Sequence, residues 1–190
     1  MFFTDKEIIV FDFDGVLVES NKIKFDAFFA IWNVYVSKNS VQRSLLLGGD
    51  RRKVINRIYK EENTLINSKY GPEFFVEAYS KLVHKEIVKI GVSSNILNFL
   101  MNSNKALFIN SATPENELIK LSNDLNISQY FSGIYGTPKS KKDNFNIIFE
   151  NNNIKAKHIA FFGDMQSDKD VADDMNIEFY KILSKESDLR

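Results

Sequence analysis

Two aspartates one residue apart follow a short apolar run that begins at Ile8 and ends at Phe11. The run contains β-branched residues and is typical of a fully buried strand. Asp12 and Asp14 stand at its carboxyl end and are followed by Gly15. A buried carboxylate is costly unless something pairs with it, and two crowded carboxylates favour a divalent cation. We therefore expect a metal-dependent site here; the alternative is a solvated turn with no further partners.

Three later apolar runs also end in polar residues. Ser111 follows the first of them, a lysine cluster at 139–142 follows the second, and Asp164 and Asp168 follow the third. In open α/β sheets, ligands bind at the carboxyl ends of the strands. We expect these residues to converge with Asp12 and to supply the partners that an isolated turn would lack.

The elements that must position these residues alternate along the chain. Strands are expected at 105–110, 131–135, 158–162 and 177–182, and helices at 96–101, from 113 onward, through 145–149 and through 171–175. Strands that alternate with helices of this length predict a mainly parallel sheet with helices on both faces. The predicted fold class is α/β, with a Rossmann-like, doubly wound parallel sheet.

Residues 17–90 follow a different pattern, in which we expect no strand. Amphipathic segments at 22–38, 51–59 and 73–87 predict helices. Gly48 and Gly49 are expected to end one helix, and Asp50 to cap the next. The sequence thus predicts a catalytic core formed by 1–16 and 91–190, with a helical cap at 17–90 inserted after the first strand.

The order of the polar residues resembles that of the haloacid dehalogenase superfamily, in the helical-cap branch of phosphoglycolate phosphatases and β-phosphoglucomutases. Asp12-Phe13-Asp14-Gly15-Val16 is similar to the first motif of the family, and Gly163-Asp164-Met165-Gln166-Ser167-Asp168 to its last. Ser111 and a lysine stand between them in the family's order. The resemblance covers nearly the whole chain.

This resemblance implies a Mg²⁺-dependent phosphatase that works through an aspartyl-phosphate. Asp12 would be the nucleophile, and Asp14 the general acid and then the general base. Mg²⁺ would be held by Asp12, Asp164 and the main-chain carbonyl of Asp14, with Asp168 a ligand directly or through water. Its charge lets an anionic carboxylate approach a phosphate. The dehalogenases lack the second aspartate of the first motif, so Asp14 favours phosphate chemistry over carbon–halogen cleavage.

Phosphate binding is expected around Ser111. Its hydroxyl and nearby main-chain N–H groups at a helix N-terminus can bind phosphate oxygens; the alternative is that Ser111 only caps that helix. Thr113 is predicted to be the cap, with Pro114 at the first helical position. Gly15 and Ala112 are predicted to contribute to substrate binding.

Lys139, Lys141 and Lys142 are three candidates for the cation that neutralises Asp12 and the transferring phosphate. The spacing from Gly136-Thr137-Pro138 favours Lys141 as the catalytic lysine, with Lys139 second. The remaining lysines of the run are then expected to be solvated.

In the insert, the segment from Gly48 to Arg52 falls where related proteins carry a specificity loop. Arginine forks bind a carboxylate or a second phosphate well, so Arg51 and Arg52 are predicted to bind substrate. A plain helix–helix turn with solvated arginines is the alternative. His84 and His158 have no partner at ligand spacing and are assigned to packing or to the surface.

Composition excludes several classes of protein. The chain has 190 residues and a formal net charge of zero, which gives no basic field for nucleic acid or an anionic membrane. It has no cysteine, hence no disulfide and no thiolate site. The first residues do not form a signal peptide, and no apolar run is long enough to span a bilayer. A cytoplasmic monomer or homodimer is expected, with no nucleic-acid or membrane partner.

The expected partner is a small phosphorylated metabolite, such as a sugar phosphate or a phosphoglycolate-like acid, because a helical cap closes over small substrates. A phosphomutase of the same fold is the first alternative. A non-catalytic module that binds a phosphate ligand is the second, and the presence of Asp12, Asp14 and Asp164 argues against it. A receiver domain would carry no helical insert after its first strand.

Overall fold

The structure, a computed structural model, describes residues 5–62 and 70–183. Its contacts divide the chain into two compact units, one of residues up to 21 and from 87 onward, the other of residues 22–86. The sequence-based division placed the borders at 16/17 and 90/91. Because the helix α4 runs from Pro72 to Ile90 without a break, the second border lies inside a helix.

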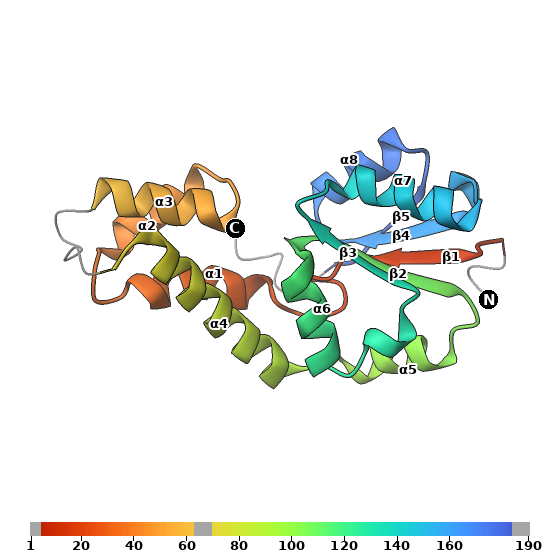
Figure 1. The fold of residues 1–190 in the computed structure, drawn as a ribbon, viewed down its shortest axis with the longest axis horizontal. Helices are drawn as coiled ribbons and strands as arrows, with labels where there is room; N and C mark the ends of the chain where they lie inside the picture. Colours follow the sequence, from red (N-terminus) through yellow and green to blue (C-terminus); the bar gives the residue numbers. More distant parts are fainter. Residues whose placement is uncertain (1–4, 63–69, 184–190) are drawn as a thin grey trace. The chain divides into compact units, whose positions relative to one another are not determined.

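Five parallel strands form the sheet of the first unit (Figure 1). They are β1 (Ile8–Phe11), β2 (Ala106–Pro114), β3 (Gly133–Thr137), β4 (Ile159–Gly163) and β5 (Glu178–Lys181), in the spatial order β3-β2-β1-β4-β5. The first strand in sequence is central, and its Val10 lies opposite Phe108 of β2 and Phe161 of β4. The predicted doubly wound α/β fold is confirmed.

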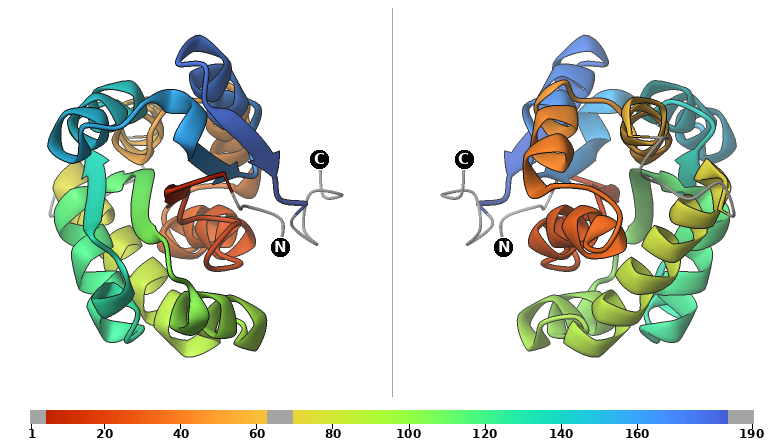
Figure 2. Two further views of the ribbon diagram at one scale, coloured as in Figure 1. Left: turned by 90° about the vertical axis from the view of Figure 1, so that its right-hand side faces the viewer. Right: turned by 90° about the vertical axis from the view of Figure 1, so that its left-hand side faces the viewer.

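Helices cover both faces of this sheet, as Figures 1 and 2 show. One face carries α5 (Ser94–Asn102) and α6 (Glu115–Asp124), and the other carries α7 (Lys141–Asn152) and α8 (Gln166–Asp174). Short 3₁₀ turns follow α6 at Ser128–Tyr130 and precede β4 at Ala156–His158. The chain therefore crosses from one face to the other between β3 and α7.

Successive strand residues point to opposite faces, so both faces contribute to the core. Val10 packs with Phe161 in one core cluster, where the Phe145 ring of α7 meets the Phe161 ring edge-on at 5.0 Å. On the other face, the ring of Phe11 lies 5.9 Å from that of Phe99 in α5. Burial on two sides explains why the strands are continuous apolar runs in the sequence.

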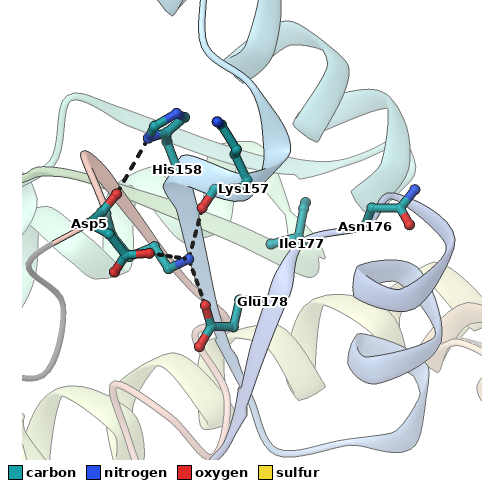
Figure 3. Close-up of a pocket in the computed structure, with 7 residues that line it drawn as sticks. Asp5, Lys157, His158, Asn176, Ile177 and Glu178 are labelled. Atoms are coloured by element: carbon teal, nitrogen blue, oxygen red, sulfur yellow. Dashed lines mark hydrogen bonds and ion pairs between the residues drawn. The ribbon is translucent and has the colours of Figure 1, made fainter.

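A pocket of about 550 Å³ lies at the amino ends of β1, β4 and β5 (Figure 3). Its lining includes the buried Lys6, whose ammonium donates to the main-chain oxygen of Lys157 (2.8 Å) and pairs with Glu178 (2.6 Å) and Asp5 (3.1 Å). Burial lowers the pKa of Lys6, but the bonds to Glu178 and Asp5 raise it by more. Lys6 thus ties three strands together, at the end of the sheet opposite to Asp12.

The second unit is helical. It contains α1 (Asn21–Trp32, of which Asn21 belongs to the first unit), α2 (Lys38–Leu46), α3 (Arg51–Glu61) and most of α4. Within residues 22–62 and 70–86 the structure has no strand. Trp32 of α1 stacks on Phe75 of α4, with ring centroids 3.9 Å apart, and both side chains are fully buried. The insert therefore has an aromatic core of its own.

The single helix expected at 22–38 was wrong, because the structure has two helices there. The first ends at Trp32, and Ser37 caps the second by accepting a hydrogen bond from the N–H of Ser40 at 3.2 Å. The apolar spacing continues across the break and concealed this cap. The Asp50 cap was predicted correctly, since its carboxylate accepts from the N–H of Lys53 at 3.0 Å.

Gly136 of β3 allows a close approach to the start of α6. A Cβ at this position would lie 2.4 Å from the carbonyl oxygen of Thr113 and 2.7 Å from the nitrogen of Glu115, both main-chain atoms. We expect Gly136→Ala to lower the free energy of unfolding by about 1–3 kcal/mol, because the backbone must move. Urea unfolding measures this. Gly71→Ala is the control, since a Cβ there meets nothing within 4 Å; equal losses in the two variants would contradict the prediction.

Candidate active site

The site is built around Asp12, the first residue after the central strand. Its main-chain N–H donates to the carbonyl of Phe162 in β4 at 2.8 Å, so the residue is held between two strands. Its side chain is buried, and Oδ1 accepts a hydrogen bond from the N–H of Phe13 at 2.8 Å. Asp12 therefore has a fixed position and little access to water.

Lys141 supplies the positive charge beside Asp12. It is the first residue of α7, which Ser140 and Asp143 begin with a reciprocal capping box. Its ammonium lies 3.1 Å from Asp12 Oδ1 and 2.5 Å from Asp168 Oδ1. One lysine is thus shared between two buried carboxylates.

Asp164 directly follows β4, and Asp168 lies in the first turn of α8. Asp168 is buried, and its Oδ2 accepts from the N–H of Met165 at 3.1 Å. Asp164 is partly buried, and its Oδ2 accepts from the side-chain amide of Asn21 at 2.7 Å. The other oxygen of Asp164, Oδ1, is buried and has no hydrogen-bond partner among the described residues.

Asp12, Asp164 and Asp168 each place a carboxylate oxygen within 4.8 Å of the others. Three carboxylates face one lysine, so the group has an excess of negative charge. Hard divalent cations prefer such oxygen ligands, and the unpartnered oxygen of Asp164 is a ready ligand. These residues fit a divalent metal ion.

The pKa values of these residues are shifted by burial and by the excess of negative charge in the group. The pKa of Asp12 is raised to about 6, chiefly by burial and also by the charges of Asp168 and Asp14, while the charge of Lys141 opposes the rise. Burial also raises the pKa of Asp164, against the hydrogen bond from Asn21. Burial lowers the pKa of Lys141, but Asp12 and Asp168 raise it by more, so the lysine remains charged.

Asp14 lies outside this group and is held by two hydroxyls. Ser20 donates to its Oδ1 at 2.5 Å, and Thr113 donates to its Oδ2 at 2.9 Å. Both bonds orient the carboxylate from outside the metal group. The ligand expected from Asp14 is its main-chain carbonyl, and this remains a prediction.

The prediction that Thr113 caps α6 was wrong. The strand β2 continues through Pro114, and Pro114 occupies the N-cap position without a side-chain cap bond. The pairing of β2 with β3 is irregular between Asn110 and Pro114. Thr113 therefore still belongs to the strand, and its hydroxyl reaches Asp14.

The residues predicted to bind phosphate lie at the ends of β1 and β2. Ser111 is buried in β2, and its hydroxyl accepts from the N–H of Thr113 at 3.3 Å, which leaves its own proton to donate. Ala112 is exposed. Gly15 is buried with φ +73°, a conformation that favours glycine. Their roles in binding remain predictions.

The three candidate lysines have different surroundings. Lys141 alone of the three forms a pair with Asp12 among the described contacts, whereas Lys142 pairs with Asp174 at 2.5 Å on the exposed side of the helix. Lys139 is exposed. The geometry favours Lys141, whose catalytic role remains a prediction.

Two buried asparagines that the sequence analysis missed hold the main chain of Lys141. The amide of Asn110 donates to the carbonyl oxygen of Lys141 at 2.9 Å, and the amide of Asn144 donates to Asn110 Oδ1 at 3.0 Å. Asn110 could have been singled out from the sequence, because it is a polar residue at the end of an apolar run.

The predicted substrate arginines lie in the second unit. The Arg51 guanidinium lies 6.0 Å from the ring centre of Tyr79, and Arg52 pairs with Glu73 at 2.6 Å. Arg57 holds the preceding loop by donating to the carbonyls of Ser44 (2.6 Å) and Gly48 (3.2 Å). These hydrogen bonds from Arg57 stabilise the loop. Substrate binding by Arg51 and Arg52 remains a prediction.

The two histidines are both partly buried and lie outside the carboxylate group. His158 lines the pocket at the amino ends of the strands (Figure 3). Its Nδ1 also lies 3.2 Å from the carboxylate of Glu7. No helix within 5–62 and 70–183 has the length and apolar character that a membrane span requires.

Solved structures of similar fold cover nearly the whole chain. A predicted phosphoglycolate phosphatase from Haemophilus somnus has a TM-score of 0.72 at 18% identity, over 95% of this chain and 87% of its own. A β-phosphoglucomutase candidate from Thermotoga maritima has a TM-score of 0.73 at 18% identity, over 93% and 85%. A magnesium-bound hydrolase candidate from Bacillus subtilis has a TM-score of 0.68 at 15% identity, over 93% and 86%. At these identities the likeness shows a shared fold.

A comparison with curated proteins finds no significant match. The model of the haloacid dehalogenase-like hydrolase family, in contrast, matches residues 9–182. This span contains Asp12, Ser111, Lys141, Asp164 and Asp168. The chain therefore belongs to the haloacid dehalogenase-like hydrolase family.

Proposed function

We propose that the protein is a Mg²⁺-dependent phosphatase that hydrolyses a small phosphorylated metabolite through an aspartyl-phosphate on Asp12. The observation that carries this proposal is the buried Asp12, paired with Lys141 at 3.1 Å and grouped with Asp164 and Asp168. Two solved structures of similar fold, a predicted phosphoglycolate phosphatase and a magnesium-bound hydrolase candidate, support it.

Asp12 performs the first step. An oxygen of its carboxylate attacks phosphorus, a new oxygen–phosphorus bond forms, and the bond from phosphorus to the substrate oxygen breaks. Protonated Asp14 gives its proton to that departing oxygen, so that an alcohol leaves. The hydroxyls of Ser20 and Thr113 hold the Asp14 carboxylate in place for this transfer.

In the second step water releases the phosphate. Asp14, now a carboxylate, takes a proton from the water as its oxygen attacks phosphorus. The bond between Asp12 and phosphorus breaks, which restores the carboxylate and yields inorganic phosphate. One carboxyl group serves as acid and then as base, so the cycle ends with the enzyme unchanged.

The surrounding groups stabilise negative charge during both steps. Lys141 offsets the charge of Asp12 and of the transferring phosphoryl group, and the Ser111 hydroxyl donates to a phosphate oxygen. Mg²⁺ held by Asp12, Asp164 and Asp168 would supply the further positive charge that brings two anions together. Substrate selection is assigned to the insert, with Arg51 and Arg52 as candidate contacts.

The proposal is tested by phosphate release from a panel of sugar phosphates and phosphorylated short acids. We expect turnover with Mg²⁺ that a chelator abolishes, and a loss of at least about 10³-fold in Asp12→Asn, which removes the nucleophile. Circular dichroism checks that the variant is folded.

Two outcomes would contradict phosphate hydrolysis. Conversion of a glucose phosphate into its isomer without phosphate release would identify a phosphomutase. Binding of Mg²⁺ without turnover of any compound would favour a non-catalytic binding module.

The ionised carboxylate of Asp12 destabilises the metal-free fold, because burial removes it from water. The pKa of Asp12 rises from 3.8 to about 6, so the destabilisation is absent below 3.8, grows with pH and is complete above about 6. We expect Asp12→Asn to raise the free energy of unfolding at pH 7.5 by on the order of 2 kcal/mol, and by progressively less toward pH 4.

Urea unfolding in the presence of chelator measures this gain at several pH values. Asp170→Asn is the control, because Asp170 is exposed in α8; its effect should stay within about 0.5 kcal/mol. A less stable Asp12→Asn at pH 7.5 would show that burial does not oppose the charge of Asp12.

The two lysines at the start of α7 form a matched pair for testing the catalytic cation. The Lys141 side chain is 13% exposed and contacts Asp12, whereas that of Lys142 is 54% exposed and pairs with Asp174. We expect Lys141→Ala to reduce turnover at saturating Mg²⁺ by at least about 100-fold, and Lys142→Ala to leave it within about threefold. The reverse order of effects would contradict the assignment of Lys141.

A further inference from the structure

Asn21 makes a contact with the carboxylate group that the proposed reaction leaves unexplained. It lies at the start of α1, and its side-chain amide donates to Asp164 Oδ2 at 2.7 Å. The two residues are far apart in the sequence but belong to the same compact unit. Asn21 takes no part in the transfer of protons or of phosphate described above.

The two carboxylate oxygens of Asp164 differ in their hydrogen bonding. Oδ2 is engaged by Asn21, whereas Oδ1 is buried and has no hydrogen-bond partner among the described residues. A buried carboxylate oxygen without a partner is unfavourable. A cation between Asp164, Asp12 and Asp168 would satisfy it, since these three carboxylates lie within 4.8 Å of one another.

We propose that Asn21 is a positioning residue for the metal ion, and that its bond to Oδ2 fixes Asp164 with Oδ1 directed to the cation. Residues that hydrogen-bond to a metal ligand orient it and raise the affinity of the site. The amide holds the carboxylate before the ion arrives, so less order has to be gained on binding. This inference rests on the Mg²⁺ site of the proposed function.

Gly15 provides the space that this arrangement needs. A Cβ on Gly15 would lie 2.2 Å from Asp164 Oδ2 and 2.6 Å from the amide nitrogen of Asn21, too close for either atom. The backbone of the first motif therefore passes directly beside the Asn21–Asp164 bond. Gly15 thus makes the turn after Asp14, with φ +73°, and also leaves room for Asp164 and its donor Asn21.

The test is Mg²⁺ affinity, measured by calorimetric titration of the metal-free protein without substrate. We expect Asn21→Ala and Asn21→Leu both to raise the Kd for Mg²⁺ about 10-fold to 100-fold. Leucine keeps nearly the size of asparagine but cannot donate, so it separates hydrogen bonding from packing. Asn116→Ala, an exposed asparagine in the first turn of α6, should bind as the wild type does.

Thermal unfolding in chelator shows that each variant is folded before titration. A wild-type Kd in Asn21→Ala would overturn the inference while leaving the proposed function intact. A wild-type Kd in Asn21→Leu alone would overturn it as well, because size and not the amide would then matter. A wild-type protein that does not bind Mg²⁺ would instead overturn the proposed function, and this inference with it.

Discussion

The crowding of three carboxylates around a single ammonium is the constraint on which the rest of the site depends. Asp12 follows β1, Asp164 follows β4 and Asp168 lies at the start of α8, and Lys141 offsets only part of the charge of these three carboxylates. Water cannot hydrate Asp12 well at this depth, so its repulsion by Asp168 is weakly screened. The folded chain holds this excess of negative charge in place, and a divalent cation would offset it.

Strand ends, helix starts and main-chain hydrogen bonds hold these charged groups together. The ends of two parallel strands, β1 and β4, and the starts of two helices, α7 and α8, meet at one edge of the sheet, and each delivers one charged side chain of the group. The carboxylate of Asp168 accepts a hydrogen bond from the N–H of Met165 at the start of α8, and this bond fixes its Oδ2. A Cβ on Gly163 would lie 2.5 Å from Cβ of Asp168, so the end of β4 must be bare there. Packing of the sheet thus overrides repulsion that would separate these residues in a flexible chain.

The strand–helix alternation could be predicted from the sequence, because the spacing of apolar residues determines it, and the positions of Asp12 and Asp164 at strand ends follow from it. The start of α2 at Ser37 could not, since apolar spacing continues across the break while the cap depends on one hydroxyl. Thr113 was misjudged for a related reason. A threonine before a proline suits a helix cap locally, and only the folded sheet brings Asp14 within its reach. The Asn21–Asp164 contact has no local signal, because its partners are distant in the sequence.

The position of β1 also affects how the chain folds. Ile8 pairs with Ala106 and with Ile159, so the central strand must wait for two segments synthesised long after it. Residues 22–86 form a contiguous unit and can collapse first, whereas the sheet is dominated by distant pairings that form slowly. Until those partner segments are available, the run Ile8–Phe11 is an unpaired apolar segment with high β-propensity. Segments of this kind tend to aggregate with other chains. Lys6 and Glu7 precede it, and Asp12 and Asp14 follow it. Asp12 and Asp14 therefore also place negative charge directly after this apolar run, which opposes its association with other chains before its partner strands exist.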